Sequence, residues 1–251
     1  MKFYTLKEKI DKILTEGIGT NNSSSRDDWI IKELSKIPKG LKLLDAGAGE
    51  AKYKKFCKHL NYVSQDIAIY DGKGNSQGIQ KNTRDYNELD IVSDIYNIPV
   101  KDNSFDVVLC TEVLEHLSDP INVFKELNRI MKKNGVLLLT APFNSLVHYA
   151  PFHYSTGFTS YFYNFHLPRF GFKINLIEPN GNYFEYISQE IRRISSVTNK
   201  YSFLRVSFLT KVALKITLNF MNKANKNDVA SSELLCYGYH IKATKFRDLS
   251  S

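Results

Sequence analysis

Three aspartates and two glycines stand where apolar segments of this sequence end. Asp45 closes the first of these segments and is followed by Gly47 and Gly49, while Asp66 and Asp94 close the next two. Glycines in a turn between a strand and a helix leave no side chain in the way, so a flat ligand lies against bare backbone. The pattern predicts a ligand site of the kind found in many nucleotide-binding proteins.

The glycine turn differs from the dinucleotide-binding pattern G-x-G-x-x-G. The position of its third glycine is Lys52. The spacing therefore does not favour a dinucleotide as the ligand.

Strands and helices alternate along the chain and would position these residues. Continuous apolar runs predict strands over residues 41–44, 61–65, 91–93, 105–110, 136–143, 173–177 and 234–245. Helical spacing predicts helices after the glycine turn, over 28–37, 121–133 and 160–167, and after residue 181. This alternation favours an α/β fold with a doubly wound, mostly parallel sheet.

Three further segments have distinct patterns. Residues 1–20 carry Phe3, Leu6, Ile10, Ile13 and Leu14 at helical spacing, without the features of a signal peptide. The polar segment 70–89 lacks periodicity and predicts a long excursion. The apolar segment 203–221 is interrupted by basic residues, so we expect a buried helix, a dimer face or a helix on a membrane surface rather than a membrane span.

Composition narrows the class of protein. The chain has 251 residues, of which 43% are hydrophobic, and a formal net charge of +8. The charge suits an anionic partner such as nucleic acid, a phosphorylated metabolite or an acidic lipid, or arises from solvated lysine-rich faces. Cys57, Cys110 and Cys236 form no CxxC pair, which indicates a reducing cytoplasm and argues against a disulfide framework or zinc ribbon.

The motifs together resemble the class I S-adenosylmethionine-dependent methyltransferases of the type 11 group. The resemblance covers residues 37–177 and rests on LLDAGAGEA, YVSQDIA, DIVSDIYNIPVKDNSFDVVLCTEVLEHL, LNRIMKKNGVLLLTAPF and the Gly-Phe before the sixth strand. It departs at Ala51, where the family often has a further glycine. The resemblance implies a seven-stranded Rossmann-like sheet in a single domain over 1–251. Its parts would be a helical cap over 1–40, a cofactor-binding core over 41–178, and acceptor-side elaborations over 144–168 and 179–232.

The resemblance also implies roles for individual residues toward S-adenosylmethionine. Gly47 and Gly49 would approach the methionyl part, with Asp45 holding the turn or reaching the amino group through water. Asp66, beside Ile67, would accept both ribose hydroxyls, because a carboxylate accepts two hydrogen bonds from a diol. Asp94 and the backbone of Ile95 would bind adenine, and Cys110 to Glu112 would line the methionyl side. Alternatively, Asp66 and Asp94 cap the following helices.

Methyl transfer to a hydroxyl also needs a base. His153, and second His148, follow the fifth strand on the acceptor side and are the candidates; each is alternatively structural or orients the substrate. His116 would support the pocket. The aromatic residues between 149 and 163 would stack a sugar or ring, or form core. No HExxH, cysteine cluster or carboxylate spacing calls for a metal.

The resemblance implies an enzyme that methylates a small molecule, with a hydroxyl on a sugar or glycan precursor as the first candidate because the family acts widely in surface polysaccharide and secondary metabolism. The cysteine pattern predicts a cytoplasmic location. An RNA methyltransferase is an alternative suggested by the positive charge, although lysine and arginine are spread rather than clustered. A third alternative is a module that binds the cofactor without turnover. A homodimer or a peripheral membrane contact through 203–221 is a further predicted association.

Overall fold

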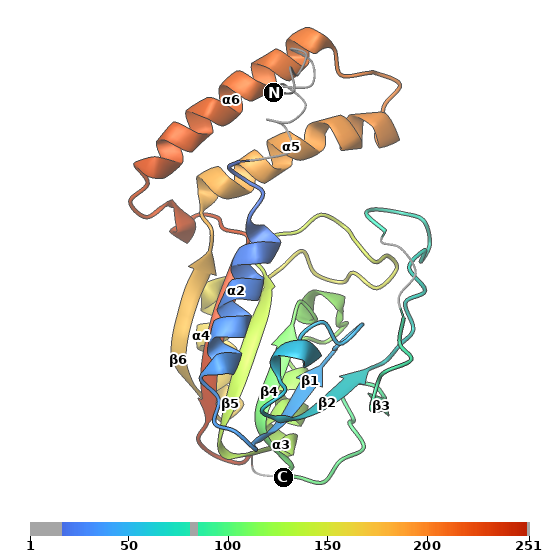
Figure 1. The fold of residues 1–251 in the computed structure, drawn as a ribbon, viewed down its shortest axis with the longest axis vertical. Helices are drawn as coiled ribbons and strands as arrows, with labels where there is room; N and C mark the ends of the chain where they lie inside the picture. Colours follow the sequence, from blue (N-terminus) through green and yellow to red (C-terminus); the bar gives the residue numbers. More distant parts are fainter. Residues whose placement is uncertain (1–16, 81–84, 250–251) are drawn as a thin grey trace. The chain divides into compact units, whose positions relative to one another are not determined.

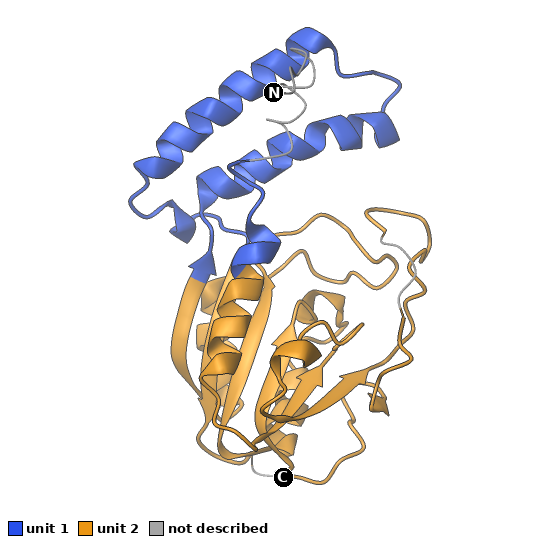
Figure 2. Cartoon of the chain, in the orientation of Figure 1, with its two compact units in different colours: residues 1–25, 179–237 blue, residues 26–178, 238–251 orange. Residues whose placement is uncertain are grey.

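The structure is a computed structural model that describes residues 17–80 and 85–249. Most of the helix predicted over 1–20 lies outside the described residues. The chain divides into two compact units, one of residues 1–25 and 179–237 and the other of 26–178 and 238–251 (Figure 2). The predicted organisation as a single domain with a cap and elaborations stays a prediction.

A seven-stranded sheet has the order β3-β2-β1-β4-β5-β7-β6 (Figure 1). Its strands are β1 (Lys42–Ala46), β2 (Asn61–Asp66), β3 (Ile91–Val92), β4 (Phe105–Thr111), β5 (Met131–Pro142), β6 (Phe172–Asn180) and β7 (Gly238–Lys245). Strands β1 to β5 pair in parallel, and β7 pairs antiparallel with β5. The predicted mostly parallel α/β sheet is confirmed.

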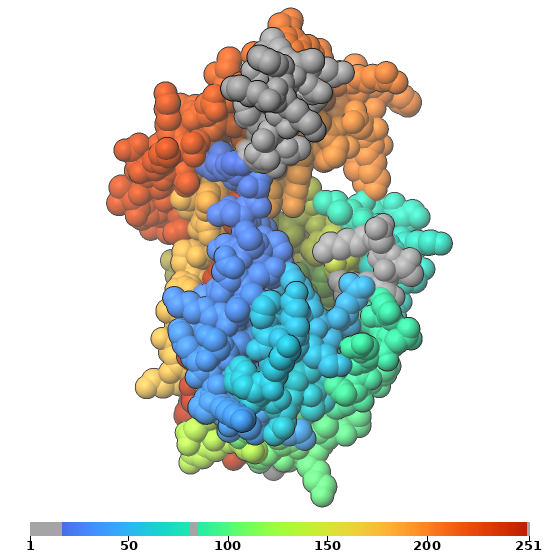
Figure 3. All heavy atoms as spheres, viewed as in Figure 1, coloured from blue at the N-terminus to red at the C-terminus, as the bar shows by residue number. Residues whose placement is uncertain are grey.

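Helices cover both faces of the sheet (Figure 1). Helix α2 (Asn22–Ser35) lies on one face, and α3 (Val123–Ile130) and α4 (Ser160–Arg169) lie on the other. Trp29 and Leu34 of α2 pack on the strands in a buried cluster. For Trp29 the sequence favours a core role over a contact with the ligand, and its burial confirms that prediction. In the space-filling view, side chains of α2 and of the segment after β1 cover this face (Figure 3). Burial of these apolar side chains holds the layers together.

Helix α2 begins earlier than predicted. The polar composition of residues 20–29 predicts a loop that ends in a helix cap, but the helix already begins at Asn22. The backbone amide of Ser25 donates to the carbonyl of Asn21, 2.8 Å away, and so starts the first turn. Short polar side chains are common both in loops and at the starts of helices, so the sequence of this segment fits either structure.

The helix predicted after the glycine turn is wrong. Ala51 has a φ of +51°, which a right-handed helix cannot accommodate. Only turns and the three-residue 3₁₀ helix η1 (Lys54–Phe56) follow. The VLEHL segment likewise forms only the 3₁₀ helix η2 (Leu114–His116).

Helix α3 ends before the predicted position. Periodicity extended it to Lys133, but Met131 pairs with Phe105 as the first residue of β5. Asn134 has a φ of +67° and turns the chain within that strand. Tertiary pairing therefore ends the helix, which local spacing alone does not reveal.

The unit of residues 1–25 and 179–237 contains α5 (Tyr183–Tyr201), α6 (Phe208–Lys226) and the 3₁₀ helix η3 (Ser231–Glu233). Asn182 caps α5 by accepting a hydrogen bond from the amide of Glu185 at 3.0 Å. Within α6 only Leu218 is buried, so the interpretation of 203–221 as a buried helix is wrong. The dimer face and the membrane-surface helix stay predictions. No helix among the described residues is long and apolar enough to span a membrane.

Candidate active site

A cavity of about 300 Å³ opens where the parallel strands end. The carboxyl ends of neighbouring parallel strands meet at one edge of a sheet, which is where open α/β sheets bind ligands. The residues that line the cavity come from the ends of β1 to β4 and from the loop after β5: Gly47, Gln65, Asp66, Ile67, Ile69, Tyr70, Tyr86, Asp94, Ile95, Tyr96, Glu112, Val113, His116, Leu117, Ser118, Tyr149, Phe152 and Tyr154.

The carboxylate of Asp66 is held in place by backbone amides. Its Oδ2 accepts from Gly49 at 2.9 Å and its Oδ1 accepts from Ala68 at 2.8 Å. Each carboxylate oxygen has further acceptor capacity, which leaves room for two hydroxyl donors from a ligand. Asp66 thus links the glycine turn to the tip of β2.

The glycine turn needs glycine at its first position. Gly47 has a φ of +75°, and a Cβ atom there would lie 2.4 Å from Cγ2 of Val113. The amides of Gly47 and Ala48 donate to the carbonyl of Gln65 at 2.8 and 2.9 Å. Gly49 has a φ of +56° and contributes through its bond to Asp66 rather than by lining the cavity. The backbone of the turn is therefore fixed against the end of β2.

The other side of the cavity begins at the end of β3. Asp94 lines the cavity and accepts a hydrogen bond from the amide of Tyr96 at 3.0 Å. Ile95 is buried and Ile67 is partly exposed, and both line the cavity. The structure thus brings Gly47, Asp66 and Asp94 around one space.

Asp45 and Cys110 do not line the cavity. Both are buried within strands, and Asp45 accepts a hydrogen bond from the hydroxyl of Tyr62 at 2.6 Å. Burial raises the pKa of Asp45 to about 7, with a smaller rise from the charge of Asp66 and a reduction from the Tyr62 bond. Asp45 therefore lies within β1, where its side chain contacts Tyr62 of β2 rather than the cavity.

The variant Asp45→Asn should become more stable relative to the natural protein as pH rises. Between about pH 4 and pH 7 the unfolded chain releases the Asp45 proton while the folded chain keeps it, so ionisation of this group disfavours folding as pH increases. Asparagine cannot ionise, and the difference in unfolding free energy should grow by up to about 1.4 kcal/mol per pH unit. Above about pH 7 it should level off. Urea unfolding across this range measures the difference; one that does not vary with pH would contradict the assignment.

Glu112 carries an ion pair at the end of β4. Its Oε2 lies 2.7 Å from Nη1 of Arg26, and its Oε1 accepts from the hydroxyl of Thr140 at 3.0 Å. The backbone of Glu112 has a φ of +54°, which turns its side chain out of the strand direction. The resemblance places the N-terminal helices over the cofactor cleft, where Arg26 could face the ligand; in the structure Arg26 does not line the cavity but pairs with Glu112, which does.

The predicted bases lie beside the cavity rather than on its wall. Neither His148 nor His153 lines it, but both rings lie near the ring of His116, which does. Tyr149, Phe152 and Tyr154 line the cavity. Of the other predicted aromatic residues, Phe158 and Tyr163 belong to the core, and Tyr161 points to solvent.

Sequence reasoning missed Glu115. Its side chain is only 1% exposed, and burial raises the pKa of this carboxyl well above its usual range. Its carbonyl accepts the amides of Tyr154 and Ser155, so it also anchors the loop that carries the histidines. A glutamate between Leu114 and His116 in an otherwise apolar turn was the available signal.

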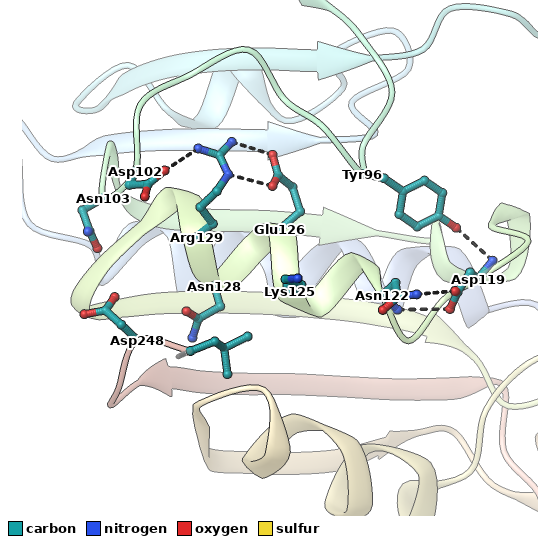
Figure 4. Close-up of a pocket in the computed structure, with 11 residues that line it drawn as sticks. Tyr96, Asp102, Asn103, Asp119, Asn122, Lys125, Glu126, Asn128, Arg129 and Asp248 are labelled. Atoms are coloured by element: carbon teal, nitrogen blue, oxygen red, sulfur yellow. Dashed lines mark hydrogen bonds and ion pairs between the residues drawn. The ribbon is translucent and has the colours of Figure 1, made fainter. Parts of the chain in front are cut away.

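A larger hollow of about 780 Å³ lies along α3 (Figure 4). Its charged groups already bind one another: Arg129 contacts Glu126 at 2.6 Å and Asp102 at 2.7 Å. The amide of Asp119 donates to the hydroxyl of Tyr96 at 2.9 Å. None of the predicted site residues lines it, so the cavity at the strand ends is the candidate site.

The seven-stranded sheet has the Rossmann-like fold of the class I methyltransferases, and the cavity lies at the ends of its parallel strands. Residues 44–139, which are less than half of the chain, match the family described as a methyltransferase domain. The resemblance seen in the sequence is thereby confirmed.

Two curated relatives each match less than half of this chain. An uncharacterized protein from Methanocaldococcus jannaschii is 30% identical over 45% of this chain and 48% of its own length. Demethylmenaquinone methyltransferase of Staphylococcus saprophyticus is 27% identical over 43% of this chain and 47% of its own. The chain thus spans about half the length of these curated relatives. The structure of a SAM-dependent methyltransferase from Archaeoglobus fulgidus has a TM-score of 0.50 and 17% identity, covering 87% of this chain and 94% of that one.

Proposed function

We propose that the protein transfers the methyl group of S-adenosylmethionine to a hydroxyl group of a small molecule such as a sugar or glycan precursor. The observation that carries this proposal is the placement of Asp66 and Asp94 at adjacent strand ends around one cavity that begins at Gly47. Asp66 would bind the ribose, and Asp94 with the backbone of Ile95 would bind adenine.

The reaction is a displacement at the methyl carbon attached to a positively charged sulfur. The leaving group needs no proton, so alignment and exclusion of water supply most of the rate enhancement. A hydroxyl acceptor must lose its proton, and we propose His153, with His148 second, as the group that takes it. Tyr149, Phe152 and Tyr154 would hold a ring against the cavity wall.

The other candidate functions have less support. Among the described residues that line the cavity there is no lysine or arginine, whereas an RNA acceptor would be held mainly through its phosphates. Transfer of label to an acceptor distinguishes the proposed enzyme from a module that binds the cofactor without turnover, because fold alone does not fix function. None of the three cysteines forms a disulfide, which supports the proposed cytoplasmic location.

Calorimetric titration with S-adenosylmethionine and with S-adenosylhomocysteine tests the cofactor. Both should bind once per chain with dissociation constants between about 1 μM and 1 mM, the range of KM values typical of enzyme substrates. A folded sample that binds neither would contradict the proposal. Incubation with methyl-labelled cofactor then tests the acceptor, with the small molecules and the RNA of a cell extract supplied as separate fractions. Label should enter the small polar molecules, and label in the RNA alone would contradict the proposed small-molecule acceptor.

A further inference from the structure

Three histidines meet beside the cavity. His116 comes from η2, and His148 and His153 come from the loop between β5 and α4. One ring nitrogen of each lies within 4.8 Å of the others. Ring centroids are 4.7 Å apart for His116 and His148, and 4.8 Å apart for His148 and His153. All belong to the unit that holds the sheet.

Backbone carbonyls fix the protonation of two of these rings. Nδ1 of His116 lies 2.5 Å from the carbonyl oxygen of Phe152, and Nδ1 of His148 lies 2.9 Å from that of Leu146. A carbonyl only accepts hydrogen bonds, so each Nδ1 carries a proton and donates. In the neutral ring, Nε2 is then the nitrogen that carries no proton, and a hydrogen bond from Nδ1–H to a carbonyl is the arrangement that orients metal-binding histidines.

Glu115 lies between these two rings. Its Oε1 is 3.7 Å from Nε2 of His116 and 3.8 Å from Nε2 of His148, which is longer than a hydrogen bond. Both carboxylate oxygens of Glu115 and both ring nitrogens of His153 are buried and have no hydrogen-bond partner among the described residues. Four such atoms in one place are costly unless another group satisfies them.

We propose that His116, His148 and His153 bind a divalent transition-metal ion, with the carboxylate of Glu115 as a fourth ligand or charge partner. Imidazole nitrogens favour zinc, cobalt, nickel or iron over magnesium and calcium, which prefer oxygen. Bonds of about 2.1 Å would bring neighbouring ligand atoms to about 3.4 Å, so the side chains would close inward on binding. This inference replaces the expectation that no metal is involved.

The metal site deepens the proposed function and rests on it for its role. Because His116 lines the cavity, an open coordination position would face an acceptor there. A metal lowers the pKa of a bound hydroxyl, whose proton then leaves to solvent. The resulting oxygen forms a bond to the methyl carbon, the carbon–sulfur bond breaks, and its electron pair stays on sulfur. In this arrangement His153 would be a metal ligand. The metal, rather than His153, would promote loss of the proton from the acceptor hydroxyl.

Competition between the full-length protein, stripped with chelator, and a chromophoric zinc indicator tests the site. We expect one zinc per chain, bound below about 1 μM, and a cobalt complex with the visible bands of nitrogen ligation. His116→Ala, His148→Ala and His153→Ala should each weaken zinc binding at least about tenfold. His166→Ala, on α4 outside the cluster, is the matched control and should bind as the natural protein does.

Two further measurements distinguish loss of the metal site from loss of the fold or of the cofactor site. Titration of the same samples with S-adenosylhomocysteine reports folding and the cofactor site independently: intact cofactor binding without zinc binding overturns only the metal. If an alanine variant does not fold, His148→Gln and Glu115→Gln, which keep side-chain volume, replace it and should also weaken zinc binding. Zinc binding that is weaker than about 100 μM, or equal in cluster variants and control, would mean a purely structural histidine cluster.

Discussion

Replacing Asp66 with alanine should weaken the binding of S-adenosylmethionine by about a hundredfold. Two charge-assisted hydrogen bonds to a ribose diol contribute about 3 kcal/mol together, and each 1.4 kcal/mol is a factor of ten in affinity. The two oxygens of Asp66 are held by the amides of Gly49 and Ala68, so the carboxylate is oriented before the ligand arrives. Calorimetry on the variant measures the loss.

Weaker cofactor binding by Asp66→Ala would have a second explanation. Alanine leaves the amide of Gly49 without its acceptor, which would loosen the glycine turn. A cofactor analogue without the 2′-hydroxyl separates the two. In the natural protein, losing that hydroxyl should weaken binding at least about tenfold, and in Asp66→Ala it should change little. Glu88→Ala removes an exposed carboxylate away from the cavity and should leave affinity unchanged. Equal losses in both backgrounds would refute the ribose assignment.

The residues around the cavity were predictable because topology places them. Apolar runs identify the strands, parallel pairing brings their carboxyl ends to one edge, and residues at or just beyond the last strand residue lie there. Asp66, Asp94 and Gly47 follow this rule. Asp45 does not line the cavity, because it is the last residue but one of β1 and remains inside the sheet beside Tyr62.

The histidine cluster could not be predicted in the same way. His148 and His153 lie on an irregular loop, whose path depends on contacts such as the amide of Tyr154 with the carbonyl of Glu115. No periodicity encodes that path, and local sequence shows only that histidines are present. The missing helix after the glycine turn has a similar cause, since the left-handed conformation of Ala51 is set by packing of the turn.

Replacing Lys245 with methionine should lower the free energy of unfolding by about 3 kcal/mol. Lys245 is fully buried at the end of β7, and its ammonium group donates to the carbonyls of Asn128 and Met131 at 2.7 Å each. It also binds Oδ1 of Asn103 at 3.0 Å. These carbonyls end α3, where a positive charge is favourable. Methionine fills the space but leaves buried oxygens without a donor.

Urea unfolding, followed by a spectroscopic signal from the unit that holds the sheet, would measure this loss of unfolding free energy. Lys173→Met makes the same substitution at an exposed position of β6 and should have little effect on the unfolding midpoint. Asp248 lies 2.6 Å from the Lys245 ammonium but is itself largely exposed, so Asp248→Ala should leave the midpoint nearly unchanged. Equal losses in Asp248→Ala and Lys245→Met would mean that the ion pair, rather than capping of α3 by the buried ammonium, stabilises this end of the sheet.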